Sequence, residues 1–132
     1  MARKRYPPDD PREWLNRARS NLALARNIIP EACLEDLCFD GQQAAEKAIK
    51  GVFIHRGERF PYVHDLDELL QLLKQNGLKI PKYVQEAKEL TRFALVTRYP
   101  GRAPPVKPRE YRRAVRIAEA VLRWAERQIG KP

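Results

Sequence analysis

The sequence predicts an all-α protein, an antiparallel up-and-down bundle of four to five helices. Apolar residues recur at steps of three and four along most of the chain, which is the spacing of one helix face. No Asn-Gly or Asp-Gly pair joins two strand-like runs. The 132 residues are enough for a single domain with its own core. We expect that core within residues 11–129, after a flexible basic N-terminus at residues 1–10.

The first helix is predicted over residues 11–29. Asp10 stands where an N-cap residue belongs, and Pro11 suits the first helical position. Pro30 is expected to end the helix. Its apolar residues are Trp14, Leu15, Ala18, Leu22, Ala25 and Ile29.

The second helix, residues 34–56, carries many small residues on its predicted buried face, and Gly57 is a natural stop. Small residues allow neighbouring helix axes to approach closely. We therefore expect this helix at the centre of the bundle, with Gln43, Lys47 and Lys50 facing away. Its predicted buried face contains Leu37, Gly41, Ala44, Ala45, Ala48, Ile49, Val52 and Phe53.

Three further helices are predicted. The third covers residues 65–75 and opens with a capping box formed by Asp65 and Glu68. The fourth covers residues 81–98, and the fifth follows a proline-rich loop at residues 109–129. The fourth is expected to bury Val84, Ala87, Leu90, Ala94 and Leu95. The fifth is expected to bury Tyr111, Ala114, Val115, Ala118, Val121, Leu122, Ala125 and Ile129.

The charge is concentrated at the two ends of the chain. The net charge of +9 divides into +4 for residues 1–26, −2 for residues 27–97 and +7 for residues 98–132. A concentrated basic face suggests a polyanionic partner, either nucleic acid or an acidic protein surface. General solubility is an equally weighted explanation of the charge alone.

Several other function classes are not indicated. No apolar run approaches the roughly 18 residues of a membrane span, and no apolar segment follows the basic N-terminal residues as in a secretory signal. We therefore expect a cytoplasmic protein without membrane association. The sequence contains no P-loop and no His/Cys metal pattern, so neither a cofactor nor a metal is predicted.

A stripe of arginines runs along the predicted last helix. Five of them fall within about 60° of one another at 100° per residue, and Arg113 lies about 40° further round. Glu119 and Glu126 lie beside the stripe, too few to pair with all of it, so we expect contact with a polyanion or an acidic partner. Aromatic residues are sparse near the stripe, with Tyr99 and Tyr111 the nearest candidates for base stacking, so sequence-specific reading of RNA is not indicated. The five are Arg109, Arg112, Arg116, Arg123 and Arg127.

Three motifs in order give a more specific indication. They are C-F-D-G-Q-Q-A-A-E-K-A-I-K-G from Cys38, G-x3-P-x2-H-D-L from Gly57, and R-Y-P-G from Arg98. Together they closely resemble the HEPN domain family, and the resemblance covers residues 14–129. It implies a small helical bundle that commonly forms a homodimer. It also implies a minimal nucleotidyltransferase as partner, a nucleotide or RNA as ligand, and in some members a toxin that cleaves RNA.

Catalytic members of that family resemble one another in an Arg-x4–6-His motif, often followed by x-Tyr, before the last helix. Arg92 and Tyr99 match this motif here and are the catalytic candidates, but Thr97 stands in the histidine position. Histidine exchanges protons near neutral pH and threonine does not. A second match, Arg59 to His64, lies in the loop before the third helix, where His64 is expected to shape the turn.

The sequence therefore predicts a non-catalytic or weakly active HEPN module, part of a toxin–antitoxin-type pair, that binds a nucleotide, RNA or a nucleotidyltransferase through an arginine-rich surface. One alternative is a metal-independent RNase toxin that uses Arg92. The other is a pure protein-interaction subunit. The predicted binding residues are Arg92, Arg98, Tyr99, Arg102, Arg109, Arg112, Arg116, Arg123 and Arg127.

Overall fold

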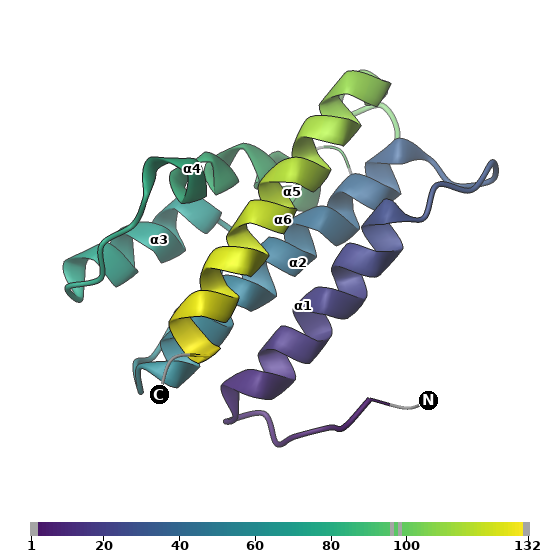
Figure 1. The fold of residues 1–132 in the computed structure, drawn as a ribbon. Coiled ribbons are helices and arrows are strands. Elements are labelled where there is room, and N and C mark those ends of the chain that lie inside the picture. The colour runs from purple at the N-terminus through teal and green to yellow at the C-terminus, as the bar shows by residue number, and fades with distance from the viewer. Residues whose placement is uncertain (1–2, 96, 98, 131–132) are drawn as a thin grey trace.

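The computed structural model describes residues 3–95, 97 and 99–130, and all regular elements in those ranges are helical. The predicted all-α bundle is therefore confirmed. Three long helices form its body: α1 (Pro11–Arg26), α2 (Leu34–His55) and α6 (Pro108–Gly130). Figure 1 shows α1 running antiparallel to both α2 and α6. No helix in the described ranges combines the length and the apolar character that crossing a bilayer requires.

The central position predicted for α2 is confirmed, because this helix packs against both α1 and α6. Its alanines and glycines are buried, and the closest approach is at Gly51. A Cβ atom placed on Gly51 would lie 3.0 Å from the Cβ of Trp14 on α1 and 3.3 Å from the Cδ1 of Ile129 on α6. The small residues of α2 thus allow the three long helices to pack closely.

The glutamine pair of α2 belongs to a buried polar network. The Gln42 side chain is fully buried, donates from Nε2 to Glu46 Oε1 at 2.9 Å, and accepts from Gln43 at 2.7 Å. Lys50 Nζ donates to Glu46 Oε2 at 2.9 Å, and His64 Nδ1 lies 2.9 Å from Glu46 Oε1. The prediction that Lys50 faces away was wrong, because its ammonium group is buried against this carboxylate.

The network also fixes the loop that precedes α3. Burial raises the pKa of Glu46, but hydrogen bonds from Lys50, Gln42 and His64 lower it by more, so the net shift is downward. The carboxylate therefore stays charged inside the protein. His64 has the structural role expected for it, since it ties the turn before Asp65 to α2. Asp65 caps α3 as predicted, accepting from the Glu68 N–H at 3.2 Å.

A second layer of shorter helices connects α2 to α6. It consists of α3 (Leu66–Gln75), α4 (Lys82–Gln85), the 3₁₀ helix η1 (Glu86–Leu90) and α5 (Arg92–Leu95). This path leads back along the bundle, so α6 runs in the same direction as α2 (Figure 1). The prediction of one continuous helix over residues 81–98 was wrong.

The spacing of the buried residues explains the break. Val84, Ala87, Leu90 and Phe93 are all buried and are spaced three residues apart. Ala87 and Leu90 lie in η1, whose three residues per turn place them on one side. Val84 and Phe93 flank them in α4 and α5. Leu95, predicted to be buried, is 53% exposed. A regular α-helix over the whole segment would bury Leu95, but the break into shorter helices leaves its side chain exposed.

Both ends of α1 have clear local causes. Asp10 accepts a hydrogen bond from the Arg12 N–H at 2.9 Å, which confirms the predicted cap. The helix ends at Arg26 and not at residue 29, and Ile29 is exposed where burial was predicted. A residue before proline is disfavoured in helical geometry, and Ile29 precedes Pro30, so the chain leaves the helix early.

The segment of residues 3–8, assigned from the sequence to a flexible N-terminus, lies against α1. Arg5 Nη2 donates to Glu13 Oε2 at 2.6 Å, and the Tyr6 N–H donates to Glu13 Oε1 at 3.0 Å. These bonds, with that from Arg5 first, lower the pKa of the Glu13 carboxyl to about 2. The segment therefore has defined contacts with the start of the helix.

We predict that Gly51→Ala lowers the free energy of unfolding by about 1 kcal/mol or more. The added methyl group meets a Cβ that belongs to the neighbouring helix, so helix axes must separate, and overpacking of this kind costs about 1–3 kcal/mol. Gly41→Ala is the matched control, because its nearest neighbours would lie at 3.9 and 4.0 Å. We expect Gly41→Ala to be neutral or stabilising, since alanine favours helix by about 1 kcal/mol. Urea denaturation measures both, and equal effects would contradict the close approach at Gly51.

Candidate functional site

The apolar face of α6 is covered by the bundle, which leaves charged residues at its two edges and on its outer side. Tyr111, Ala114, Ala118, Val121, Leu122 and Ala125 are buried as predicted, and Ile117 and Trp124 are buried as well. The helix lies on α2, with α1 along one side and α4 and η1 along the other. What each edge contacts decides which charges remain unpaired.

Two of the three acidic residues of α6, Glu119 and Glu126, lie on the edge that faces α1. Glu126 Oε2 is 2.6 Å from Arg19 Nη2, and Glu119 forms an ion pair with Arg26. Both glutamates were expected to neutralise part of the arginine stripe on their own helix. In the structure both glutamates form ion pairs with arginines of α1, although Arg123 of the stripe lines one pocket with them.

On the opposite edge of α6, which faces η1, Arg113 also forms ion pairs. Arg113 contacts Glu89 at 2.7 Å and Glu86 at 3.0 Å, both on η1. The hydrogen bond and the charge of Glu89 raise the pKa of Arg113, and the bond from Arg113 lowers the pKa of Glu89. Arg113 is therefore compensated within the chain.

Arg92, the matching residue of the catalytic motif, is compensated in the same way. Its Nη2 lies 3.1 Å from Glu110 Oε2, and its Cζ lies 4.3 Å from the centre of the Phe93 ring. Hydrogen bonds from the Lys107 N–H and from Arg92 lower the pKa of Glu110. The partner on α6 was missed in the sequence, because Arg92 and Glu110 are brought together only by the tertiary fold.

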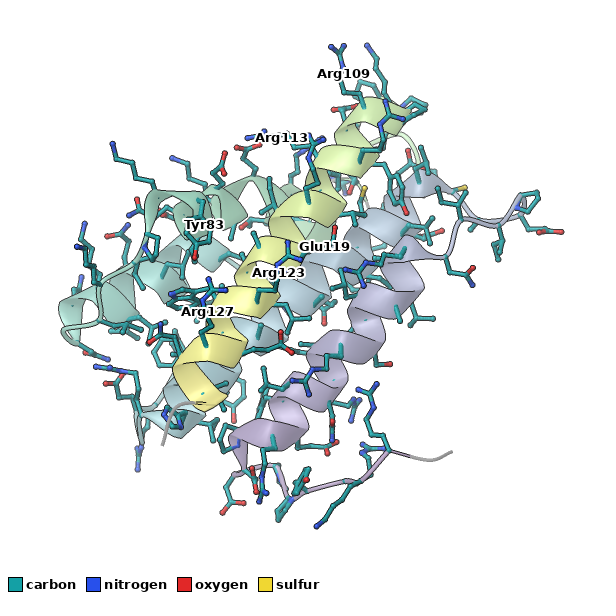
Figure 2. The ribbon with its side chains drawn as sticks, in the orientation of Figure 1. Tyr83, Arg109, Arg113, Glu119, Arg123 and Arg127 are labelled. Carbon is teal, nitrogen blue, oxygen red and sulfur yellow. The ribbon has the colours of Figure 1, made fainter. Side chains whose placement is uncertain are left out.

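Four arginines remain on the outer side of α6, and we call them the arginine strip: Arg109, Arg112, Arg116 and Arg123. All four are exposed and make no hydrogen bond or ion pair within residues 3–95, 97 and 99–130. Figure 2 shows Arg109 at one end of α6 and Arg123 well along it, about 21 Å apart at 1.5 Å per residue. Within the described residues, α6 thus holds a row of four guanidinium groups without an ion partner, of which Arg123 lines one pocket with Glu119 and Glu126.

Other predicted binding residues lie near this strip or apart from it. Arg127 donates to the neutral Tyr83 hydroxyl at 2.7 Å, so its charge is not offset by that contact. Arg102 is exposed in the loop before α6. Arg98 lies outside the described residues.

The segment of the catalytic motif opens on a different surface from the strip. Thr97 and Tyr99 line an open groove of about 600 Å³ together with Glu35 and Asp36 of α2. Thr97 is only 6% exposed, and its hydroxyl is 3.5 Å from the carbonyl oxygen of Arg92. The Arg92 side chain lines a separate pocket with Glu89 and Glu110. The structure therefore does not place Arg92 in one pocket with Thr97 and Tyr99.

Fold and surface together define a small helical domain with a basic outer helix. Residues 11–128 match the family model of the HEPN domain. The chain belongs to the HEPN domain family, and the resemblance seen in its motifs is confirmed.

Two solved structures are similar to this one. TT1696 from Thermus thermophilus is 32% identical with a TM-score of 0.79, covering 89% of this chain and 97% of that one. ST0689, an archaeal HEPN homologue, is 26% identical with a TM-score of 0.72, covering 91% of this chain and 98% of that one. No curated protein gives a significant match.

We predict that the purified protein cleaves RNA weakly or not at all and that Arg92→Ala behaves identically. Threonine cannot transfer the proton that strand cleavage requires, and losing such a group typically lowers a rate by about 10²–10⁴-fold. The measurement is gel analysis of a labelled RNA incubated with each protein in the presence of a chelator. Cleavage by the natural protein that disappears in Arg92→Ala would establish the RNase alternative instead.

Proposed function

We propose that this protein is a non-catalytic or weakly active HEPN module that binds RNA through the arginine strip. One observation carries the proposal: Glu119 and Glu126 of α6 pair with arginines of α1, and Glu110 pairs with Arg92. Four arginines in a row on α6 are thereby left without an ion partner among the described residues. The planar guanidinium fork matches phosphate oxygens in a bidentate manner. A rigid helix also holds the row in place before any ligand binds, which lowers the entropy lost on binding.

The chemistry of the strip favours the RNA backbone over the bases. Tyr111, considered from the sequence as a stacking residue, is buried and donates its hydroxyl to the Ala25 carbonyl oxygen at 2.5 Å. Tyr99 lines the groove beside α2 and not the strip. Since Tyr111 is buried and Tyr99 lines another groove, the proposed binding rests on phosphate contacts, which carry no base sequence information directly. The proposed binding is therefore independent of sequence and sensitive to salt.

The wider biological setting is proposed from family resemblance. We place the protein in the cytoplasm as a homodimer, paired with a minimal nucleotidyltransferase in a toxin–antitoxin-type system. In that setting a nucleotide is a second possible ligand, because it offers the same phosphate chemistry as RNA. An acidic surface of the nucleotidyltransferase is the alternative contact for the strip.

We predict that Arg112→Gln/Arg116→Gln weakens RNA binding and flattens its salt dependence. Each phosphate contact on a single strand contributes about −0.7 to the slope of log K against log salt. Removing two contacts should therefore reduce the slope by about 1.4. The measurement is fluorescence anisotropy with a labelled oligouridylate between about 50 and 200 mM salt, a range chosen to expose this dependence.

The matched control is Arg92→Gln/Arg113→Gln, which removes the same formal charge from arginines that are already paired with glutamates. We expect RNA binding by this control to keep most of its dependence of log K on log salt. If both double variants lose the same slope, binding depends on net charge and the strip has no special role. If RNA does not bind at all, the protein-interaction alternative is favoured.

A further inference from the structure

A second basic surface lies on α1, on the side that faces away from the core. An open groove of about 1090 Å³ is formed between the segment of residues 3–8 and the later turns of the helix. Four arginines line it: Arg3, Arg5, Arg17 and Arg26. Among the described residues no carboxylate lines the groove, and the polar residues Ser20 and Asn27 complete it. None of its residues belongs to the arginine strip.

Two of these arginines are not paired with any acid among the described residues. Arg3 Nη1 donates to the carbonyl oxygen of Asn16, a neutral group, at 2.7 Å. Arg17 makes no hydrogen bond or ion pair within the described part of the chain. Its charge also acts on Lys47, whose pKa is lowered first by burial and then by Arg17. The potential on this side of α1 is therefore positive.

The other two arginines are paired but keep free donors. Arg5 uses Nε and Nη2 toward Glu13, and Arg26 uses Nη2 toward Glu119. A guanidinium group has five N–H donors in a fixed fork, so donors on both arginines remain available. The groove thus offers many donors and a net positive charge.

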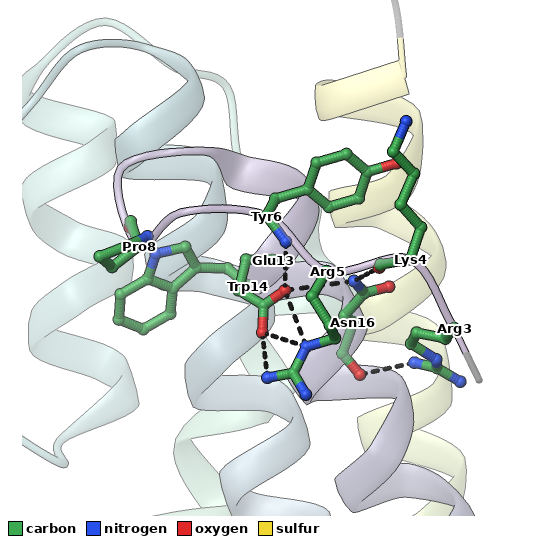
Figure 3. Close-up of polar contacts among 8 residues, drawn as sticks. All are labelled: Arg3, Lys4, Arg5, Tyr6, Pro8, Glu13, Trp14 and Asn16. Atoms are coloured by element: carbon green, nitrogen blue, oxygen red, sulfur yellow. Dashed lines mark hydrogen bonds and ion pairs between the residues drawn. The ribbon is translucent and has the colours of Figure 1, made fainter.

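The N-terminal segment is held by specific hydrogen bonds, shown as dashed lines in Figure 3. Asn16, which is only 8% exposed, donates from Nδ2 to the Lys4 carbonyl oxygen at 2.7 Å. Arg3 bonds back to the Asn16 carbonyl oxygen. These two reciprocal contacts bring Arg3 to the edge of the groove. The neutral residue Asn16 therefore positions the charged Arg3 side chain at the edge of the groove.

We propose that this groove binds a chain of phosphate groups and that the N-terminal segment completes the site. The part of α1 from Asn16 to Arg26 is about 15 Å long, which exceeds the size of one phosphate. A lining with arginine forks and without carboxylates among the described residues suits successive phosphates. The phosphate chain of inorganic polyphosphate and that of an RNA strand share this chemistry.

The experiment uses the full chain with the four arginines of the arginine strip replaced by glutamine. Any phosphate binding that remains can then be assigned to the groove. Two probes are used. Binding of inorganic tripolyphosphate is measured by calorimetry, and binding of a labelled oligouridylate is measured by fluorescence anisotropy. We expect Arg17→Ala to weaken binding about tenfold or more, because a hydrogen bond to a charged group contributes about 1.5–3 kcal/mol. Arg59→Ala removes the same charge from an exposed loop arginine and should change affinity less than about twofold, as expected for an exposed charge outside the site.

Asn16→Ala tests the part played by the segment, because it changes no charge. We expect it to weaken binding about threefold or more, since a net hydrogen bond contributes about 0.5–1.5 kcal/mol; thermal unfolding checks that the bundle persists. Loss with both probes, or with either one alone, supports the site and identifies the source of the phosphates. If Arg17→Ala and Asn16→Ala both behave like Arg59→Ala with both probes, the site does not exist. That failure would leave the arginine strip untouched, because the two surfaces share no residue.

Discussion

The surface charge of this protein depends on how the edges of α6 are paired. Two of its glutamates reach across to Arg19 and Arg26 of α1. The third, Glu110, reaches Arg92 of α5, and Arg113 reaches η1. Exposed ion pairs of this kind contribute only about 0–1 kcal/mol each to stability. Their larger consequence is for the distribution of charge. Glutamates that pair with arginines of other helices are less available to neutralise the arginines on the outer side of α6.

The buried centre of the bundle makes this arrangement possible. The small residues of α2 allow α1 and α6 to lie close enough for their edges to meet. Glu46 and Lys50 are buried as a pair, and the bonds from Gln42 and His64 satisfy the carboxylate further. A buried pair is weak evidence for stability. Here it has a visible structural consequence, since it attaches the loop before α3 to the central helix.

Local signals in the sequence were sufficient for much of the fold. The caps at Asp10 and Asp65, the apolar face of α6 and the central place of α2 all follow from neighbours within a few residues. The spacing of three among Val84, Ala87 and Leu90 was also present in the sequence, but it was interpreted as α-helix. Lys50 was misplaced because a helical pattern does not reveal that Glu46, one turn earlier, is itself buried.

The candidate site was less accessible to sequence reasoning because its charge depends on partners far apart in the chain. Arg19 and Glu126 are 107 positions apart, and Arg92 and Glu110 are 18 apart. The pattern of arginines on α6 was visible, but not which of them are paired. The groove on α1 was missed because its formation requires the N-terminal segment to lie back along the helix.

The central claim is that unpaired and paired arginines of α6 differ in their contact with phosphate. Two-dimensional NMR of the arginine Nε–Hε groups, recorded while an oligouridylate is added, observes each guanidinium separately. The account predicts shifts for Arg109, Arg112, Arg116 and Arg123, with Arg113 nearly unchanged. Equal shifts for all five, or no shift in the strip, would contradict it.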